Sequence, residues 1–420
     1  METRLFVSVD LEGRTHVVGT LWARASRGRE SATFEYDPAW LENPGRFALE
    51  PALALGAGPL HTLPNRAVFG AIGDSAPDRW GRRLIQREER RRAREAKRPP
   101  RTLNEADYLL GVSDIARQGA LRFSRTEGGP YLAEGGENDI PPLVRLPRLL
   151  DAAMAVDAGG DAVAADDDLR LLLAPGSSLG GARPKASVID NDGTLSIAKF
   201  PKSDDTISVP AWEAVALGLA AKAGIDTPAW RLQTVAERPV LILRRFDRDG
   251  AVRIPFLSAM SLVGAADGEE HSYMEIADAL RQHGAAPEAD CAQLWRRIVF
   301  NILVSNTDDH LRNHGVLYRT RRGWRLAPAY DLNPMPVDLK PRFLTLAINE
   351  AENAASLDVA LDVAKHFGVK PKDAHAIVKE VGEARAGWRE EALGAGLSRS
   401  EIKRMASAFE HEDSAAAAAL

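Results

Sequence analysis

Two polar residues in the last third of the chain have the types and the spacing that phosphoryl transfer requires. Asp308 precedes Asn313 by five positions, inside the segment Ser305–Gly315. In the catalytic loop of protein kinases the same spacing separates an aspartate that accepts the substrate hydroxyl proton from an asparagine that holds magnesium. The pattern predicts that Asp308 is a catalytic residue and that Asn313 binds a metal.

A predicted β-hairpin would bring a third oxygen ligand to the same place. Val316–Tyr318 and Trp324–Leu326 have the composition of short strands, and residues 320–323 form a turn between them. Because a hairpin starts and finishes at one end, Asn313 and Asp331 should lie side by side. Oxygen ligands of this kind are those that Mg²⁺ prefers.

Two simpler interpretations apply to this segment. Asp, Asn and His are common in turns, so the Asp-to-Asn spacing is a weak signal when it stands alone. His310 and His314 also have the spacing of a zinc pair on a helix, with Asp308 or Asp309 as a third ligand. The segment lacks the glutamate of the usual zinc-protease helix. The kinase interpretation requires, in addition, a nucleotide-binding half upstream.

A segment rich in small residues, 175–185, is a candidate phosphate-binding loop. Its sequence is Pro-Gly-Ser-Ser-Leu-Gly-Gly-Ala-Arg-Pro-Lys, and the backbone N–H groups of such loops can approach phosphate closely. It matches neither a Walker A nor a Rossmann fingerprint. Two predicted strands follow, Lys185–Ile189 and Thr194–Phe200, on either side of an Asn-Asp-Gly turn that is a strong hairpin signal.

Lys199 and Glu213 are predicted to serve the same nucleotide site. Lys199 shares the apolar face of its strand with Leu195 and Ile197, where a lysine needs an anionic partner or a route to solvent. Glu213 lies in the first turn of a helix predicted over 210–220, from which it could orient Lys199. Two alternatives stay open, since Lys199 could extend to solvent and glutamate is favoured in the first turn of any helix.

In their order along the chain, these motifs resemble the HipA family of serine/threonine kinase toxins. The motifs that carry the resemblance are Ser178–Lys185, Ala198–Pro201, Arg245–Arg248, Asn306–Asn313 and Tyr330–Asp331. It extends to the N-terminal run Phe69–Arg82, whose residues alone suggest no catalytic chemistry. The resemblance covers nearly the whole chain.

The resemblance implies a role for each matching residue. Asp308 would be the catalytic aspartate, with Asp309 as its rival, and Asn313 and Asp331 would be the magnesium ligands. ATP would be bound by the following residues, the last two forming the hinge that holds adenine: Ser178, Gly180, Gly181, Lys185, Lys199, Glu213, Arg244 and Phe246.

Ser178 also matches the loop serine whose autophosphorylation shuts off kinases of this family. A phosphate group adds about two negative charges. At the place where ATP phosphates must dock, those charges should expel the loop by repulsion. Ser177 lies beside it as an alternative site.

The function that the resemblance implies is an ATP- and Mg²⁺-dependent serine/threonine protein kinase that acts as a toxin. Its expected partners are a HipB-like helix-turn-helix antitoxin, DNA indirectly through that antitoxin, and a protein substrate such as an aminoacyl-tRNA synthetase. Two alternatives are a non-catalytic corepressor that acts with the antitoxin and a small-molecule kinase. The intact set of Lys199, Asp308, Asn313 and Asp331 favours catalysis.

Composition and charge agree with a cytoplasmic enzyme of two or three domains. The 420 residues are 45% hydrophobic, the start alternates like a strand rather than a signal peptide, and no apolar run reaches the roughly 18 residues of a membrane span. Arg82–Arg101 holds ten basic residues against three glutamates. It could bind DNA phosphates, whereas a solvated helix face with Glu–Arg pairs is the commoner outcome.

The predicted fold class is α+β, a two-lobed protein-kinase-like fold with an additional N-terminal α/β subdomain. The expected parts are the N-terminal subdomain (1–125), a kinase N-lobe with the Gly-rich loop and hinge (126–250), and a helical C-lobe with the catalytic and metal-binding loops (251–420). Helices are predicted over 287–305 and 373–393. The alanine-rich end, Ser414–Ala419, is predicted to fray.

Overall fold

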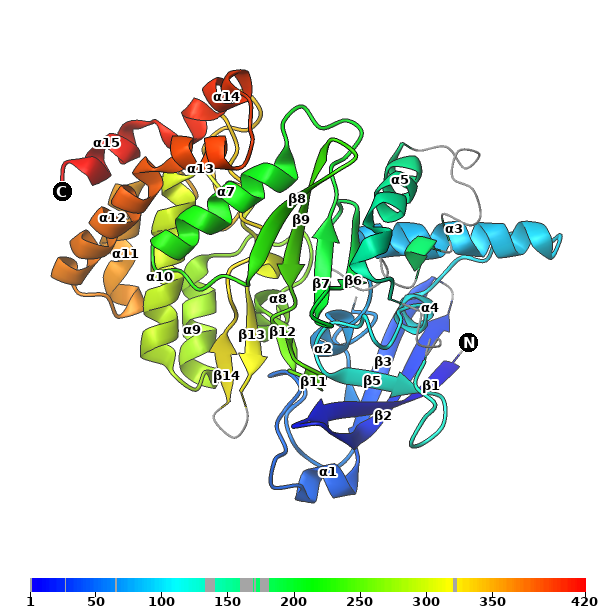
Figure 1. The fold of residues 1–420 in the computed structure, drawn as a ribbon. Helices are drawn as coiled ribbons and strands as arrows, with labels where there is room; N and C mark the ends of the chain where they lie inside the picture. The colour runs from blue at the N-terminus through cyan, green and yellow to red at the C-terminus, as the bar shows by residue number, and fades with distance from the viewer. Residues whose placement is uncertain are drawn as a thin grey trace.

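A computed structural model describes most of the chain (Figure 1). The residues outside the described part are 1, 27, 65, 133–139, 159–168, 170, 174–180 and 320–322. The N-terminal sheet lies on one side of the molecule, the C-terminal helices gather on the other, and a second sheet stands between them (Figure 1).

The N-terminal part is built on a five-stranded antiparallel sheet in the order β4-β3-β2-β1-β5. Its strands are β1 (Glu2–Leu11), β2 (Arg14–Ser26), β3 (Arg29–Tyr36), β4 (Leu60–His61) and β5 (Leu121–Ser124). The helices of this part are α1 (Pro38–Glu42), α2 (Gly70–Gly73), α3 (Arg79–Glu95) and α4 (Glu105–Leu110). The strand predicted at the start of the chain is confirmed, with Leu5, Val7 and Val9 buried at every second position.

A four-stranded sheet in the order β6-β7-β9-β8 follows. Its strands are β6 (Lys185–Ile189), β7 (Leu195–Lys199), β8 (Trp230–Val235) and β9 (Arg238–Arg244). The alternation of side chains along β9 places Leu241 and Leu243 in the core with α7 (Val209–Lys222), whereas Val240 and Ile242 pack with α5 (Leu146–Asp157). The predicted hairpin of β6 and β7 and the helix with proline in its first turn are both confirmed.

The rest of the chain is mainly helical, as predicted. Its principal helices are α8 (Ala259–Val263), α9 (Tyr273–His283), α10 (Pro287–Leu303), α11 (Leu357–Val363), α12 (Pro371–Ala386), α13 (Trp388–Gly394), α14 (Arg399–Phe409) and α15 (Glu412–Ala418). A small sheet, β12 (Phe256–Ser258), β13 (Gly315–Tyr318) and β14 (Trp324–Leu326), lies among them. Within the described residues, no helix is both long enough and apolar enough to cross a bilayer.

Two predictions about the C-terminal helices are wrong. The helix expected over 373–393 is interrupted at Gly387, which separates α12 from α13. The alanine-rich end does not fray, because α15 is anchored by Asp413, whose carboxylate accepts hydrogen bonds from the backbone N–H of Leu357 (2.8 Å) and from Arg342 (2.7 Å). Buried polar contacts of this kind can hold a chain end whose small side chains offer little apolar surface to bury.

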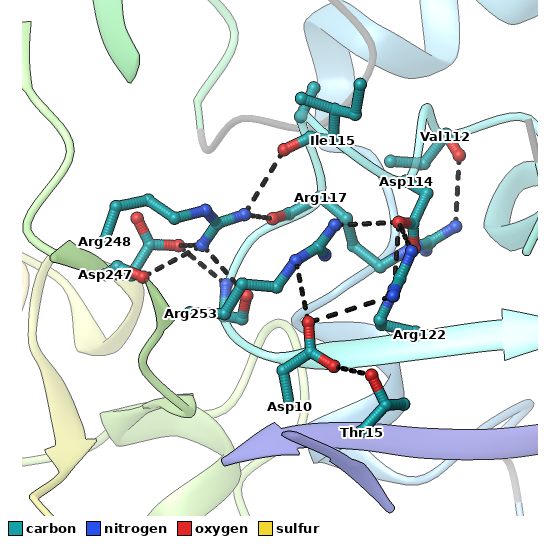
Figure 2. Close-up of polar contacts among 12 residues, drawn as sticks. Asp10, Thr15, Val112, Asp114, Ile115, Arg117, Arg122, Asp247, Arg248 and Arg253 are labelled. Atoms are coloured by element: carbon teal, nitrogen blue, oxygen red, sulfur yellow. Dashed lines mark hydrogen bonds and ion pairs between the residues drawn. The ribbon is translucent and has the colours of Figure 1, made fainter. Parts of the chain in front are cut away.

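A buried network of arginines and aspartates joins the N-terminal part to the segment that follows β9 (Figure 2). Asp247 accepts hydrogen bonds from Arg245 (2.5 and 2.6 Å), from Arg248 (2.9 Å) and from the backbone N–H of Gly119 (2.7 Å). Arg248 also donates to the carbonyl of Arg117 at 2.6 Å. The Arg245–Arg248 motif therefore fastens the N-terminal part to the second sheet.

The charges in this network strongly favour an ionised Asp247. Burial alone would raise the pKa of its carboxyl group, but the guanidinium groups of Arg245 and Arg248 outweigh burial and hold that pKa well below its usual range. Burial also lowers the pKa of Arg248 to about 9. The junction thus consists of charges that are paired in the folded chain and hydrated in the unfolded chain.

We predict that Asp247→Ala lowers the free energy of unfolding by about 3–5 kcal/mol, because it leaves two buried guanidinium groups without their carboxylate. Since the folded-state pKa of Asp247 is depressed, its contribution is present above pH ~4 and declines as the pH falls further. Urea unfolding at pH 7 and at pH 3 measures both effects. Glu410→Gln, at an exposed pair with Arg389, is the control and should cost less than about 1 kcal/mol. Equal losses for the two variants would contradict the prediction.

Candidate active site

The structure brings Lys199, Glu213 and Asp331 together at the junction of the second sheet and the helical part. The Lys199 ammonium donates a hydrogen bond to Glu213 Oε1 at 2.6 Å and another to the carboxylate of Asp331. Glu213 is 2% exposed, and the Lys199 side chain is 13% exposed. Lys199 is therefore held between two carboxylates, rather than extended to solvent.

The electrostatics of these three groups keep Lys199 charged. Burial opposes the ammonium form, but the carboxylates of Asp331 and Glu213 outweigh burial and raise the pKa of Lys199. For Asp331, burial alone would raise the pKa, but the charges of Lys199 and Lys185 outweigh burial and hold that pKa below the usual value. A cation fixed in this way can bind an anionic ligand without first acquiring a proton.

The hairpin of β13 and β14 places Asn313 and Asp331 at the same end, as the sequence indicated. The strands pair antiparallel, with Val316 opposite Leu326. Beyond their ends, the Tyr330 hydroxyl donates to the carbonyl of Arg312 at 2.8 Å, which ties the two flanking segments together. Of the turn predicted between the strands, residues 320–322 lie outside the described part.

The side-chain oxygens at this end of the hairpin are ligands that suit a hard cation. Asn313 Nδ2 donates to the carbonyl of Asp308 at 3.1 Å, so the amide group is oriented by the loop and its oxygen is the acceptor. Asp331 adds a carboxylate, and Mg²⁺ prefers such oxygen ligands. Asp331 also has a positive φ of 56°, a backbone conformation that side-chain-bearing residues rarely adopt outside functional sites and tight turns.

Asp308 and Asp309 differ sharply in their surroundings. Asp309 is 2% exposed and accepts hydrogen bonds from the Tyr273 hydroxyl (2.6 Å), Asn301 Nδ2 (2.8 Å) and His314 Nε2 (2.7 Å). The side chain of Asp308 is 63% exposed. Asp309 therefore anchors the loop, whereas Asp308 is accessible to solvent and contacts only the Lys340 ammonium, at 3.4 Å, among the ion pairs of the described residues.

The zinc interpretation of His310 and His314 finds no support. The residues between them form the short 3₁₀ turn η2 (Leu311–Asn313) rather than an α-helix, and His314 is engaged with Asp309. In the described part of the chain, no three His, Cys, Asp or Glu side chains converge as a metal site.

The predicted phosphate-binding loop is described only in part. Ser177, Ser178 and Gly180 lie outside the described residues. Gly181 has a positive φ of 95°, which favours glycine at this position. Lys185 is buried, and its ammonium lies 3.3 Å from the carboxylate of Asp78. The sequence interpretation missed Asp78, although it lies in the run Phe69–Arg82 that belongs to the family resemblance.

The two hinge candidates lie in different surroundings. Arg244 ends β9 and is exposed. Phe246 is half-buried and packs against Tyr330, with ring centroids 5.5 Å apart. Phe246 therefore contacts the residue that precedes Asp331, whereas the side chain of Arg244 is not part of this buried cluster.

The basic segment Arg82–Arg101 forms most of α3 and the turn after it. Glu88 accepts hydrogen bonds from Arg91 and Arg92, and Glu89 accepts one from Arg98 at 2.6 Å. Both glutamates are only 7% exposed, because arginine side chains cover them. The structure thus shows Glu–Arg pairing along the helix, which is the second of the two alternatives.

Comparison with known families and proteins gives concordant matches. Residues 177–388, about half of the chain, match the family described as the HipA-like C-terminal domain. Residues 9–100 match the family described as the HipA N-terminal domain. A Sinorhizobium fredii protein called "Putative kinase Y4mE" is 27% identical over 356 residues, which are 77% of this chain and 77% of that protein. A second protein of that organism, "Putative kinase Y4dM", is 31% identical over 44% of this chain and 53% of its own length.

Among solved structures, HipA of Shewanella oneidensis, in a complex with HipB and operator DNA, superimposes with a TM-score of 0.70. The match covers 98% of this chain and 96% of that one at 15% identity, and at this identity the likeness concerns the fold. The predicted two-lobed, kinase-like α+β fold is thereby confirmed. The domain boundaries at residues 125 and 250 remain predictions.

We predict that truncation of the two neighbouring aspartates has very different effects on stability. Asp309→Ala should lower the free energy of unfolding by about 3 kcal/mol, because it leaves three buried donors without an acceptor. Asp308→Ala, at an exposed position, should change it by no more than about 0.5 kcal/mol. Chemical denaturation monitored by tryptophan fluorescence measures both. A larger loss for Asp308→Ala would show that we have assigned the two roles the wrong way round.

Proposed function

The chain belongs to the HipA family, and on that basis we propose that it is an ATP- and Mg²⁺-dependent serine/threonine protein kinase that acts as the toxin of a toxin–antitoxin pair. The observation that carries the proposal is the buried Lys199, held by Glu213 and Asp331. In protein kinases a lysine on a strand pairs with a helix glutamate and contacts nucleotide phosphates, while an aspartate beyond the catalytic loop binds the metal. The relatives called putative kinases agree with this chemistry.

The proposed chemistry assigns each residue a task at a stated atom. Lys199 keeps its contact with Glu213 and turns its remaining donors from Asp331 to the phosphates. The oxygens of Asn313 and Asp331 would hold Mg²⁺, which would offset the negative charge of the phosphates. The exposed carboxylate of Asp308 orients the acceptor hydroxyl and accepts its proton. Since little covalent chemistry is asked of the protein, positioning and charge carry most of the rate enhancement.

The remaining nucleotide contacts are proposed from the sequence and from partial structural support. Gly180, Gly181 and Ser178 would bring loop N–H groups to the phosphates, with Lys185 at the base of the loop. Arg244 and Phe246 would form the hinge, where Phe246 offers an aromatic ring that packs against Tyr330 with the ring planes tilted by 32°. Autophosphorylation of Ser178 would switch the kinase off by placing negative charge where ATP phosphates bind.

The partners are proposed by analogy with the related complex. HipA of Shewanella oneidensis was solved with HipB and operator DNA, and we propose that this chain likewise binds a HipB-like helix-turn-helix antitoxin and reaches DNA through it. The phosphoryl acceptor would be a protein serine or threonine, such as one on an aminoacyl-tRNA synthetase. A corepressor without catalysis would have no need of the intact Lys199, Asp308, Asn313 and Asp331.

Phosphate incorporation from labelled Mg·ATP tests the proposal. We expect the native protein to label itself on Ser178, and Asp308→Asn to lose at least about 10²-fold of the rate, since general base catalysis contributes 10²–10⁴-fold. Ser178→Ala should lose the self-label and still phosphorylate substrate. Glu410→Gln, at a distant exposed pair, should label like the native protein.

Mass-spectrometric site mapping distinguishes the outcomes. Label on Ser177 would move the switch by one residue without changing the kinase assignment. Native protein that binds ATP, yet labels neither itself nor proteins of a bacterial lysate, would sink the kinase proposal and favour the corepressor.

A further inference from the structure

The N-terminal part reaches the candidate phosphate site through two residues, Asp78 and Trp80. The Lys185 ammonium lies 3.3 Å from Asp78 Oδ2, and Trp80 Nε1 donates to the Lys185 carbonyl at 2.9 Å. Trp80 is fully buried and Lys185 is 3% exposed. The N-terminus of α3 therefore holds both the backbone and the side chain of the residue that begins β6.

Lys185 lies opposite Lys199 in the β6–β7 pair, and Lys199 contacts Asp331. Burial raises the pKa of Asp78, and the charge of Asp331 adds to that effect. For Asp331, burial also raises the pKa, but the charges of Lys199 and Lys185 outweigh it. The Lys185 ammonium also lies against the backbone of Gly181, since a Cβ atom there would be only 2.8 Å from it. Lys185 thus contacts Asp78 and the backbone of Gly181, on the strand paired with the one that carries Lys199.

The two carboxylate oxygens of Asp78 have separate tasks. Oδ1 accepts a hydrogen bond from the backbone N–H of Gly81 at 2.8 Å and caps α3. Oδ2 contacts Lys185. An asparagine can keep the cap, because its amide oxygen accepts the same bond, but it cannot neutralise an ammonium. The structural role and the electrostatic role can therefore be separated by one substitution.

We propose that Asp78 is a positioning residue for phosphoryl transfer, supplied by the N-terminal part, which holds Lys185 beside Asp331 until the phosphates of a nucleoside triphosphate replace it as the partner of that ammonium. The inference rests on the proposed kinase function for the identity of the ligand. It gives the run Phe69–Arg82 a chemical purpose: Lys185 is held in place before nucleotide arrives, and the N-terminal part is coupled to the occupancy of the site.

A split between affinity and turnover is the expected signature. Asp78→Asn removes a negative charge that competes with phosphate for Lys185, so Mg·ATP should bind about threefold to tenfold more tightly, which corresponds to about 0.7–1.4 kcal/mol. Turnover should fall about tenfold, because Lys185 is no longer fixed in its catalytic position. A residue that only stabilised the fold would not raise the affinity for ATP.

The test is calorimetric titration of Mg·ATP and of adenosine into the full-length native protein, Asp78→Asn, Lys185→Met and the double variant. Asp37→Asn is the matched control, since Asp37 caps α1 through the N–H of Ala39 (2.8 Å), and α1 lies far from β6 in Figure 1. We expect Asp78→Asn to tighten ATP without changing adenosine binding. Lys185→Met should weaken ATP binding, and adding Asp78→Asn to Lys185→Met should have no further effect.

Each other outcome overturns the inference. ATP affinity in Asp78→Asn equal to that of Asp37→Asn would leave Asp78 as a helix cap, and a full Asp78 effect in the Lys185→Met background would show that it does not act through Lys185. Asp78→Asn alone could fail to fold, because it leaves Lys185 buried without its partner, and the double variant removes both charges. If the double variant and Lys185→Met then differ in ATP affinity, the idea is wrong. If the native protein binds no Mg·ATP, the proposed function is overturned as well. If the native protein binds Mg·ATP and Asp78→Asn binds it with the same affinity, only this inference is overturned.

Discussion

The buried ammonium of Lys199, shared by Glu213 and Asp331, is the interaction on which the rest of the structure depends. A lysine in that position is tolerable only if carboxylates compensate its desolvation. Each of those carboxylates comes from a different part of the chain: Glu213 from α7, and Asp331 from the segment after β14. The ion pairs therefore hold the second sheet and the helical part in one relative position.

The catalytic loop shows how the fold keeps one carboxylate exposed by burying another. Asp309 is saturated by donors from Tyr273, Asn301 and His314, so the loop backbone is fixed at that point. Its neighbour Asp308 consequently projects into solvent without contributing to the anchor. The Asp308 carboxylate keeps a contact with the Lys340 ammonium at 3.4 Å, so a fixed backbone carries a side chain that is largely exposed to solvent.

Local signals explain why parts of the fold could be predicted from the sequence. The Asn-Asp-Gly turn predicts the hairpin of β6 and β7. The composition of β13 and β14 predicts a second hairpin, with Asn313 and Asp331 at the same end. The contact of Lys185 with Asp78 spans 107 residues, and no periodicity or turn signal reports such a pair. The anchoring of α15 by Asp413 could not be predicted either, because Asp413 contacts Leu357, 56 residues away. The alanine-rich composition indicates only how the chain end behaves locally.

The way the N-terminal part is attached indicates what it contributes. Its contacts include Asp78 with Lys185, Gly119 with Asp247, and Asp74 with Ser258, and all of these are polar and at least partly buried. Apolar side chains of similar volume can stabilise such a junction as well or better, so stability alone does not account for charged groups there. Directional bonds instead permit one orientation, and here that orientation brings the first turn of α3 against the first residue of β6. The N-terminal part is thereby attached at Lys185, on the strand that pairs with the one carrying Lys199.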